Sequence, residues 1–424
     1  MNPNWNQLDE DLADMVFARL EGRDLARARL PCSRWARVVK ETARHLNLRG
    51  EHIKRSFHES FPNLKTLSVV GNVSDATLVN ISNSRRLEHV ELYDRAGGAS
   101  LSREAVSALA SIPSLCSLDV YSCSPFTDAN IDVFGPMMAI NMFSIRDTHV
   151  EFLPDTLSYF RASVSLDVTG IRAFAGIRYL QWLDIGYSTD THPGWLEPLS
   201  ELRLRVLCVN DCDYSDIASI SGMTTLEALD MNDTGVTPGD LTALGTLVNL
   251  TRLDIAYCRC RYTQRSGLPE VIEKLQRLRY LNIYDTCAIT VQSDFVPYAA
   301  KPHGLLVSRK NSVLEVLVAG ERDLILEDMS RLPMSLSRLE IRGANIRSGV
   351  IGYIMATLPW LSYIDMRFVE NVSMSDLYKV PKRIEYLVTN KKMLQRFIED
   401  NYPRVYYDPL SKDESTGMPH DLLF

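Results

Sequence analysis

The chain has 424 residues, of which 46% are hydrophobic and 23% charged, and its formal net charge is -7. This composition can bury a large core, and the excess of acids argues against nucleic acid as a partner, because phosphate recognition needs a basic surface. The sequence shows no secretory signal peptide and no membrane span, so we expect a cytoplasmic and/or nuclear protein with no membrane partner. Its eight cysteines are dispersed and are expected to be reduced thiols.

Residues 1-48 predict a small module of three short helices. Apolar residues from Leu8 to Leu20 recur at helical spacing, and Gly22 with Asp24 ends this helix and caps a second one over 25-30. A third helix is expected from Pro31 through Lys40, with the proline in its first turn. Three short helices make too little core to stand alone, so we expect this module to dock on something.

Residues 49-390 repeat one apolar pattern. Leu250, Leu253, Ile255 and Cys258 follow the L-x-x-L-x-L-x-x-N/C spacing of a leucine-rich repeat. Good copies also begin at Leu64, Leu115, Leu180, Leu204, Leu226 and Leu278, and looser copies begin at Leu87, Ile140, Leu157, Leu314, Leu336, Leu361 and Ile384. These make fourteen copies of about 25 residues each. Near Leu157 the segment 164-168 competes for the same repeat.

The predicted fold is α/β: a leucine-rich-repeat solenoid with parallel strands on its concave face and helices outside, preceded by the all-α module. Each strand is followed by a short helix, and a hydroxyl residue is expected at the N-cap of several: Ser74, Ser102, Thr127, Thr237 and Ser373. The surplus residues 287-313 are either an ordinary surface loop or part of a binding surface. Residues 391-424 are expected to form a C-terminal cap and a flexible tail.

The N-terminal module resembles an F-box in residue type and spacing, over the segments 8-12, 16-20, 23-25, 28-30 and 32-35. An F-box directly before such repeats resembles the leucine-rich-repeat subclass of F-box proteins, over about residues 8 to 390. Two positions depart from the family's pattern: Asp9 stands where proline is usual, and Pro31 stands where an aliphatic residue precedes Cys32.

The resemblance implies a substrate-recognition subunit of a cullin-RING (SCF-type) E3 ubiquitin ligase. The F-box would bind the Skp-type adaptor, which joins the cullin scaffold, and the repeats would bind a protein substrate. The implied adaptor-facing and core residues are Leu8, Leu12, Val16, Phe17, Leu20, Leu25, Leu30 and Trp35. Three alternatives stay open: a helical module that only caps the solenoid, a receptor for a different cullin, and a leucine-rich-repeat scaffold with no ligase role.

Acidic residues occupy the strand position between the second and third apolar residues of the better copies. Because side chains alternate along a strand, these acids should line the concave face, together with several aromatic residues. The predicted substrate-binding residues are Glu91, Tyr93, Asp119, Tyr121, Asp184, Asp230, Asp254 and Tyr284. They predict either an acidic groove for a basic segment of a partner, or water-facing acids that serve solubility and bond to nearby backbone.

Catalytic and metal-binding motifs are not found. Repeated carboxylates on an open surface would have near-identical, hydrated environments, which does not suit a general acid and base pair. The eight histidines are dispersed without H-E-x-x-H or C-x-x-C motifs, and no glycine-rich phosphate loop follows a strand. We therefore expect a monomeric receptor that is not an enzyme and has no metal or cofactor.

Overall fold

A computed structural model describes the chain from residue 33 to residue 389 with gaps. The described residues are 33-93, 101-121, 139-142, 153-162, 166, 168-188, 194-212, 217-236, 240-258, 268-285, 310, 312-320, 323-324, 329-347, 349-369, 372, 381 and 383-389. The chain divides into two compact units, Met1–Ile185 and Gly186–Phe424. Each unit is described separately.

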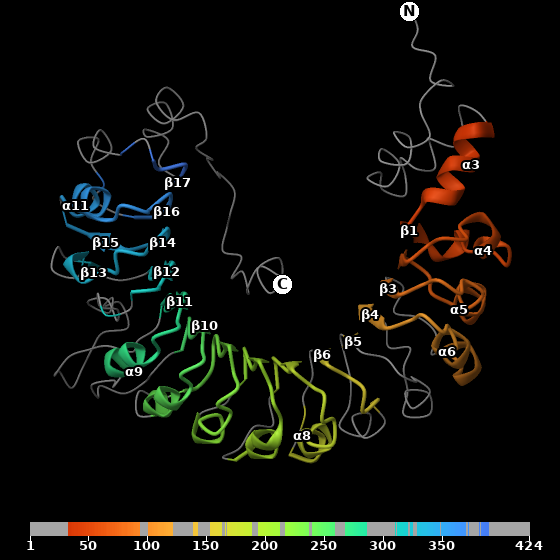
Figure 1. Cartoon of the computed structure of the whole chain (residues 1–424), viewed down its shortest axis with the longest axis horizontal. Helices are drawn as coiled ribbons and strands as arrows, with labels where there is room; N and C mark the ends of the chain where they lie inside the picture. The colour runs from red at the N-terminus through yellow and green to blue at the C-terminus, as the bar shows by residue number, and fades with distance from the viewer. Residues whose placement is uncertain are drawn as a thin grey trace, which may run out of the picture. The chain divides into compact units, whose positions relative to one another are not determined.

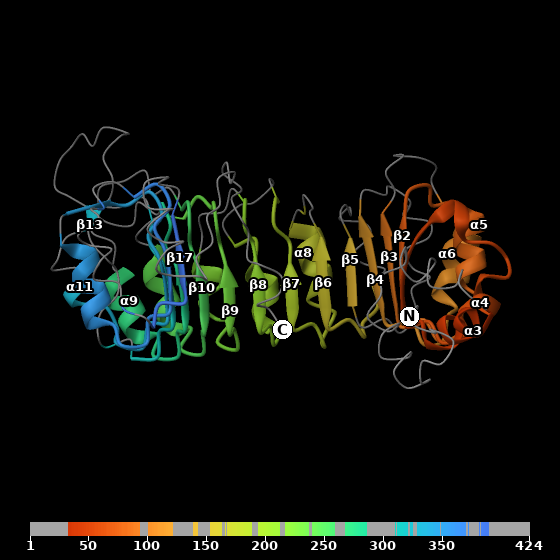
Figure 2. The same ribbon diagram turned by 90° about the horizontal axis from the view of Figure 1, so that it is seen from above.

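Unit 1 is a ladder of parallel strands, each paired with the next along the chain (Figures 1 and 2). The strands are β1 (His45–Arg49), β2 (Thr66–Val70), β3 (His89–Tyr93), β4 (Ser117–Tyr121), β5 (Ala139–Met142), β6 (Tyr159–Ala162) and β7 (Trp182–Asp184). The helices are α3 (Ser33–Thr42), η2 (Gly50–His52), α4 (Phe57–Ser60), α5 (Asp75–Ile81), α6 (Arg103–Ala110) and α8 (Val168–Phe174).

Unit 2 repeats this plan with ladder strands of three residues each. Its ladder contains β8 (Val206–Cys208), β9 (Ala228–Asp230), β10 (Arg252–Asp254), β11 (Tyr280–Asn282), β12 (Val316–Val318), β14 (Arg338–Glu340), β16 (Tyr363–Asp365) and β17 (Tyr386–Val388). A second small sheet pairs β13 (Asp323–Leu324) with β15 (Asn345–Ile346). The helical segments are η4 (Glu197–Glu201), η5 (Ile217–Ser219), η6 (Asp240–Thr246), α9 (Leu268–Lys274) and α11 (Val350–Thr357).

The apolar pattern explains the position of the strands. In the described residues, thirteen ladder strands begin two residues after a predicted first apolar residue, as β10 does after Leu250. Leu253 and the residues in register with it, Leu229 and Leu281, are fully buried, because every second strand residue points towards the helices. The competing segment near Leu157 is decided in favour of Leu157, because Tyr159–Ala162 is a strand and the helix α8 begins at Val168.

One predicted register is wrong. Ile140 was expected to be the first apolar residue of its copy, but it lies in the middle of β5, in register with Leu118 and Phe160. The first position of this copy therefore falls three residues earlier, on Met137. Met137 lies outside the described residues, and a pattern built on leucine overlooks an apolar but unbranched methionine.

Helix caps at two predicted positions are confirmed. Ser74 caps α5 by accepting from the backbone N–H of Thr77, whose own hydroxyl bonds back to the Ser74 backbone. Ser102 caps α6 in the same way at Ala105, with a distance of 3.2 Å. The other three predicted caps, at Thr127, Thr237 and Ser373, lie outside the described residues, as do the segments 287-309 and 390-424.

The helix α3 is joined directly to the start of the unit 1 ladder. Val38 and Val39 are buried, and the Asn63 side-chain amide donates to the backbone oxygen of Glu41 at 2.8 Å. Strand β1 occupies the segment that follows the predicted third helix and pairs with β2 along its full length. Residues 1-32, which carry most of the F-box-like pattern, lie outside the described residues.

Candidate functional site

The strand face is the candidate site. We define it as the side chains at the first and third positions of each ladder strand, such as Arg252 and Asp254 on β10, together with the fifth position in β1 to β4. These side chains point away from the buried middle row, and in each unit the described helices lie on the opposite side of the strands (Figures 1 and 2). The exposure and the contacts of each strand-face side chain therefore depend on the side chains in register with it on the neighbouring strands.

Third-position side chains in unit 2 cap the turn that ends each strand. The same hydrogen bond, from the backbone N–H two residues later to a side-chain oxygen, is formed at 3.0 to 3.1 Å by Asp230, Asp254, Asn282 and Asp365. In each case the residue after the bonded one has a positive φ: Asp233, Tyr257, Asp285 and Phe368, at 45° to 60°. Asp and Asn suit this turn because their short side chains reach the backbone two residues ahead.

Two of the predicted substrate-binding acids are not in water. Asp230 and Asp254 are 6% and 3% exposed, and Asn282 donates to Asp254 at 2.8 Å. Burial raises the pKa of Asp254 to about 6. The hydrogen bonds that Asp254 accepts from the Ala256 backbone and the Asn282 amide lower the pKa but do not outweigh burial. The expectation that these two acids form a hydrated acidic groove is therefore wrong, because their neighbours cover them and the turn uses their oxygens.

Acids near the end of unit 2 are paired with arginines. Asp365 is fully buried and lies 2.7 Å from the guanidinium of Arg342 and 2.9 Å from that of Arg367. Glu340 lies 2.6 Å from Arg338 and 2.9 Å from Arg342. Here the strand face carries an alternating network of both signs of charge, not a row of unpaired acids.

Aromatic rings on the strand face are held by neighbours in register. The Arg252 guanidinium lies 3.8 Å from the centre of the Tyr280 ring, and that of Arg338 lies 4.2 Å from the Tyr363 ring. In unit 1, Tyr159 and Trp182 are stacked with centres 4.0 Å apart, and Arg161 pairs with Asp184 at 3.1 Å. Cation-π and stacking contacts of this kind fix large side chains before a partner arrives.

Tyr284, another predicted residue, lies just past β11. Its ring centre is 5.3 Å from that of Tyr257. The ring also lies beside Gly320, where any Cβ would collide with the Tyr284 ring and with the Arg342 backbone oxygen. The glycine therefore makes room for the tyrosine. This pair of rings stands at the end of the strands where the chain turns, beside the strand face.

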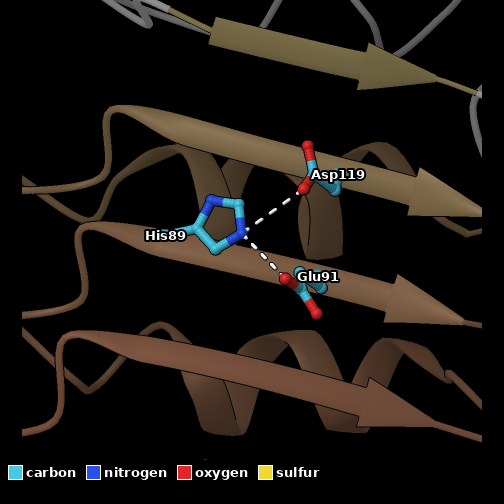
Figure 3. A group of neighbouring side chains, drawn as sticks. All are labelled: His89, Glu91 and Asp119. Carbon is cyan, nitrogen blue, oxygen red and sulfur yellow. Dashed lines mark hydrogen bonds and ion pairs between the residues drawn. The ribbon is translucent and has the colours of Figure 1, made fainter. Parts of the chain in front are cut away.

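In unit 1 the structure brings together His89, Glu91 and Asp119 (Figure 3). His89 Nε2 is 3.2 Å from Glu91 Oε1 and 3.3 Å from Asp119 Oδ2. Hydrogen bonds to Asp119 and then Glu91 raise the pKa of His89 to about 9, against the effect of burial, and the bond from His89 lowers the pKa of Glu91. Without another cation, the three side chains form an ion-paired group with a charged imidazole.

The remaining predicted residues are placed as follows. Tyr93 lies at the half-buried end of β3, in register with Tyr121 at the end of β4, whose side chain lies outside the described part of the chain. Of the predicted adaptor residues, Trp35 lies in α3 with its side chain outside the described residues, and the other seven precede residue 33. The structure thus places the predicted substrate-binding residues on or beside the strand face, and it leaves the adaptor residues undescribed.

Sequence reasoning overlooked the basic residues of the strand face. His89, Arg161, Arg252 and Arg338 each stand at a first or third strand position beside an acid or an aromatic ring. The signal was present, because aligning the repeats on their apolar residues also aligns these partners. The search for linear histidine motifs could not find His89, since one of its partners is 30 residues away on the next strand.

Comparison with known proteins establishes the fold. The chain matches no protein-family model and no curated protein. Among solved structures it is similar to an internalin from Listeria monocytogenes, at 17% identity and a TM-score of 0.51 over 82% of this chain and 96% of that one. It is also similar to a leucine-rich-repeat protein from Leptospira interrogans, at 15% identity and a TM-score of 0.55 over 92% of this chain and all of that one. The predicted leucine-rich-repeat solenoid fold is confirmed. In the described residues no helix is long and apolar enough to cross a membrane.

Proposed function

We propose that this chain is a receptor that binds a protein partner on its strand face and catalyses no reaction. The observation that carries the proposal is the set of aromatic and arginine side chains held in register there, such as Trp182 on Tyr159 and Arg252 on Tyr280. Trp, Tyr and Arg dominate the binding energy of protein interfaces. Because neighbouring contacts already fix these side chains, less conformational entropy is lost on binding.

The charge of the strand face refines the kind of partner. Its acids are paired with His89 in unit 1 and with arginines such as Arg161 and Arg338, so the surface offers both signs of charge. Such a surface selects a partner of matching mixed charge, and electrostatic matching contributes more to specificity than to affinity. A basic segment of the partner would meet carboxylates that are already paired with His89 or with arginines.

Removing two strand-face rings is expected to abolish partner capture. The double variant Trp182→Ala, Tyr386→Ala removes one aromatic residue from each unit, and truncating such residues at an interface costs about 2 kcal/mol or more each, roughly 30-fold in affinity. The measurement is quantitative recovery of co-purified proteins from cells that express the tagged full chain. Circular dichroism confirms that the variant is folded.

A matched control uses two rings that are more exposed but lie off the strand face. Tyr179 precedes β7 and Trp360 precedes β16, and they are 68% and 72% exposed. The double variant Tyr179→Ala, Trp360→Ala is expected to recover the same proteins as the wild type. If both double variants lose the same proteins equally, the strand face is not the binding surface.

We further propose that residues 1-48 recruit the Skp-type adaptor of a cullin-RING ubiquitin ligase, so that the repeats act as its substrate receptor in the cytoplasm and/or nucleus. Support comes from the F-box-like residues between Leu8 and Trp35 and from the position of this segment directly before the repeats. The receptor would raise the local concentration of its substrate near the conjugating machinery. Such a role requires two binding surfaces and no active site.

The adaptor is expected to bind the wild-type chain but not Leu20→Asp or a chain lacking residues 1-32. This deletion keeps α3, because Val38 and Val39 are buried at the start of the ladder. Val79→Asp is the matched control, since it places the same charge on an exposed apolar residue of α5, 46% exposed. Purified Skp-type adaptors and the full chain are mixed and separated by size-exclusion chromatography. Adaptor retained by the deleted chain would contradict the proposal.

A leucine-rich-repeat scaffold without a ligase role is the second candidate, and one observation favours it. The helix α3 has Val39 buried and is tied by Glu41 to Asn63, in the segment just before β2, as an end cap of the ladder would be. In that case the strand-face variants lose the partner while no Skp-type adaptor binds. Binding of a different cullin adaptor to the same N-terminal residues would instead indicate another class of ligase.

A further inference from the structure

We propose that His89, Glu91 and Asp119 form a binding site for a divalent transition-metal ion such as Zn²⁺, with three protein ligands and the remaining coordination positions open to water. The ligand atoms are His89 Nε2, Glu91 Oε1 and Asp119 Oδ2, which all lie within 4.8 Å of one another (Figure 3). An imidazole nitrogen with two carboxylate oxygens is a ligand set that zinc and its neighbours accept.

The spacing of the ligand atoms fits a metal ion. Bonds of about 2.0-2.2 Å at tetrahedral or octahedral angles place two ligand atoms about 3.0-3.5 Å apart. The distances from His89 Nε2 to the two carboxylates, 3.2 and 3.3 Å, fall in this range. The three ligand atoms lie within 4.8 Å of one another, and each carboxylate can rotate about its last side-chain bond to turn an oxygen towards a shared ion.

The strands hold the three ligands in place. His89 and Glu91 are two residues apart on β3 and therefore share one face, and Asp119 stands in register with Glu91 on β4. Both strands are paired on each side, β3 with β2 and β4 with β5, so the ligands cannot drift apart. Sites built on paired strands hold their geometry better than sites on loops.

The charge around this group also favours a cation. The neighbouring strand-face positions in register carry the neutral residues Thr66, Ser68 and Ser117. Elsewhere on the described strand face, an acid such as Asp184 or Glu340 has an arginine beside it, which is always charged and occupies the carboxylate. Here the cation is a histidine, which can release its proton and bind metal through the same nitrogen.

The side chains leave access for an ion. Those of His89, Glu91 and Asp119 are 25%, 29% and 19% exposed, so they are neither sealed nor fully hydrated. Three protein ligands leave at least one position for water, as in zinc sites that keep an open coordination position.

The test is metal binding by the tag-free full chain after treatment with a chelator and its removal. Zn²⁺ is titrated by calorimetry, and Co²⁺ is added as a spectroscopic probe whose visible absorption reports nitrogen and oxygen ligands. The wild type is expected to bind Zn²⁺ at this site and to unfold at a higher temperature with the metal than without it. The variants His89→Gln, Glu91→Gln and Asp119→Asn are expected to bind at least about 10-100-fold more weakly, since even lost outer-shell partners cost that much.

His45→Gln is the matched control. His45 stands at the first position of β1, as His89 does on β3, but the third position of β1 is Asn47, so the carboxylate is missing. This variant is expected to bind Zn²⁺ as the wild type does. The proposal is overturned if the wild type binds no metal, or if the three ligand variants, folded by circular dichroism, keep the wild-type affinity and Co²⁺ spectrum.

Discussion

Replacing Asp365 by alanine is expected to lower the free energy of unfolding by about 3-5 kcal/mol, the usual cost of breaking a buried ion pair from one side. Asp365 is fully buried and accepts from the Arg367 backbone and from the guanidinium groups of Arg342 and Arg367. Without the carboxylate, Arg367 and Arg342 each lose a buried charged acceptor, of which Arg342 still has Glu340, and the turn after β16 loses its cap. Urea unfolding followed by circular dichroism measures the change.

Two further variants separate the ion pair from the turn. Asp365→Asn keeps an oxygen for the Arg367 backbone but removes the charge. Its free energy of unfolding should therefore lie between those of the wild type and the alanine variant. Glu315→Ala removes an acid paired at 3.1 Å with Arg279 in a contact that is 48% and 65% exposed, and it should cost no more than about 1 kcal/mol. An Asp365→Ala loss as small as that of Glu315→Ala would show that the buried network contributes nothing specific.

The leucine spacing alone placed thirteen of the fifteen described ladder strands, because the sequence repeats with the same period as the strands. Leu253 is buried since it is the middle residue of a strand, and the first leucine two residues before the strand fixes where that strand begins. The pattern failed at Ile140, which lies within β5 in register with Leu118: the sequence has Met137 two residues before this strand, so a leucine-based template slips by three residues. Because methionine is apolar but unbranched, it is easily missed by a repeat pattern that is defined by leucine.

The third strand position shows what alternation cannot predict. Alternation correctly places Asp254 on the face opposite Leu253, but exposure depends on the neighbours in register, Asp230 and Asn282. The residue type at the third strand position predicts its role better. Asp and Asn there bond to the backbone of the following turn, while Glu340, whose side chain is longer, pairs with arginines instead.

The candidate site was predictable only in part, because its partners come from different repeats. Glu91 and Asp119 were predicted together since both occupy the same repeat position, yet the sequence does not say that His89 lies between them. Aligning the repeats on their apolar residues gives the residues in register, but His89 stands in register with Ser117 and reaches Asp119 diagonally. The long-range pairs therefore had to be found in the structure.

The stability advantage of the wild type over Asp254→Asn is expected to fall as the pH rises from about 4 to 6. Burial raises the pKa of the Asp254 carboxyl to about 6, from 3.8 in the unfolded chain, so the folded state holds the proton more tightly. Well below pH 3.8 the group is protonated in both states and this contribution is fully present. Above pH 6 it is ionised in both, and the folded state bears the cost of a buried charge, about 2-3 kcal/mol.

The variant isolates this group from the other titrating residues. Asparagine at position 254 cannot ionise but keeps an oxygen for the backbone N–H of Ala256, and its altered contact with Asn282 adds an offset that does not change with pH. The slope of the difference with pH therefore reports the titration of Asp254 together with its interaction with neighbouring ionisable groups, measured as paired urea unfolding curves at pH 4, 5, 6 and 7. A difference that stays flat, or that grows with rising pH, would mean that Arg252 and Asn282 stabilise the carboxylate enough to outweigh its burial, and that the strand face does hold a settled negative charge at this position.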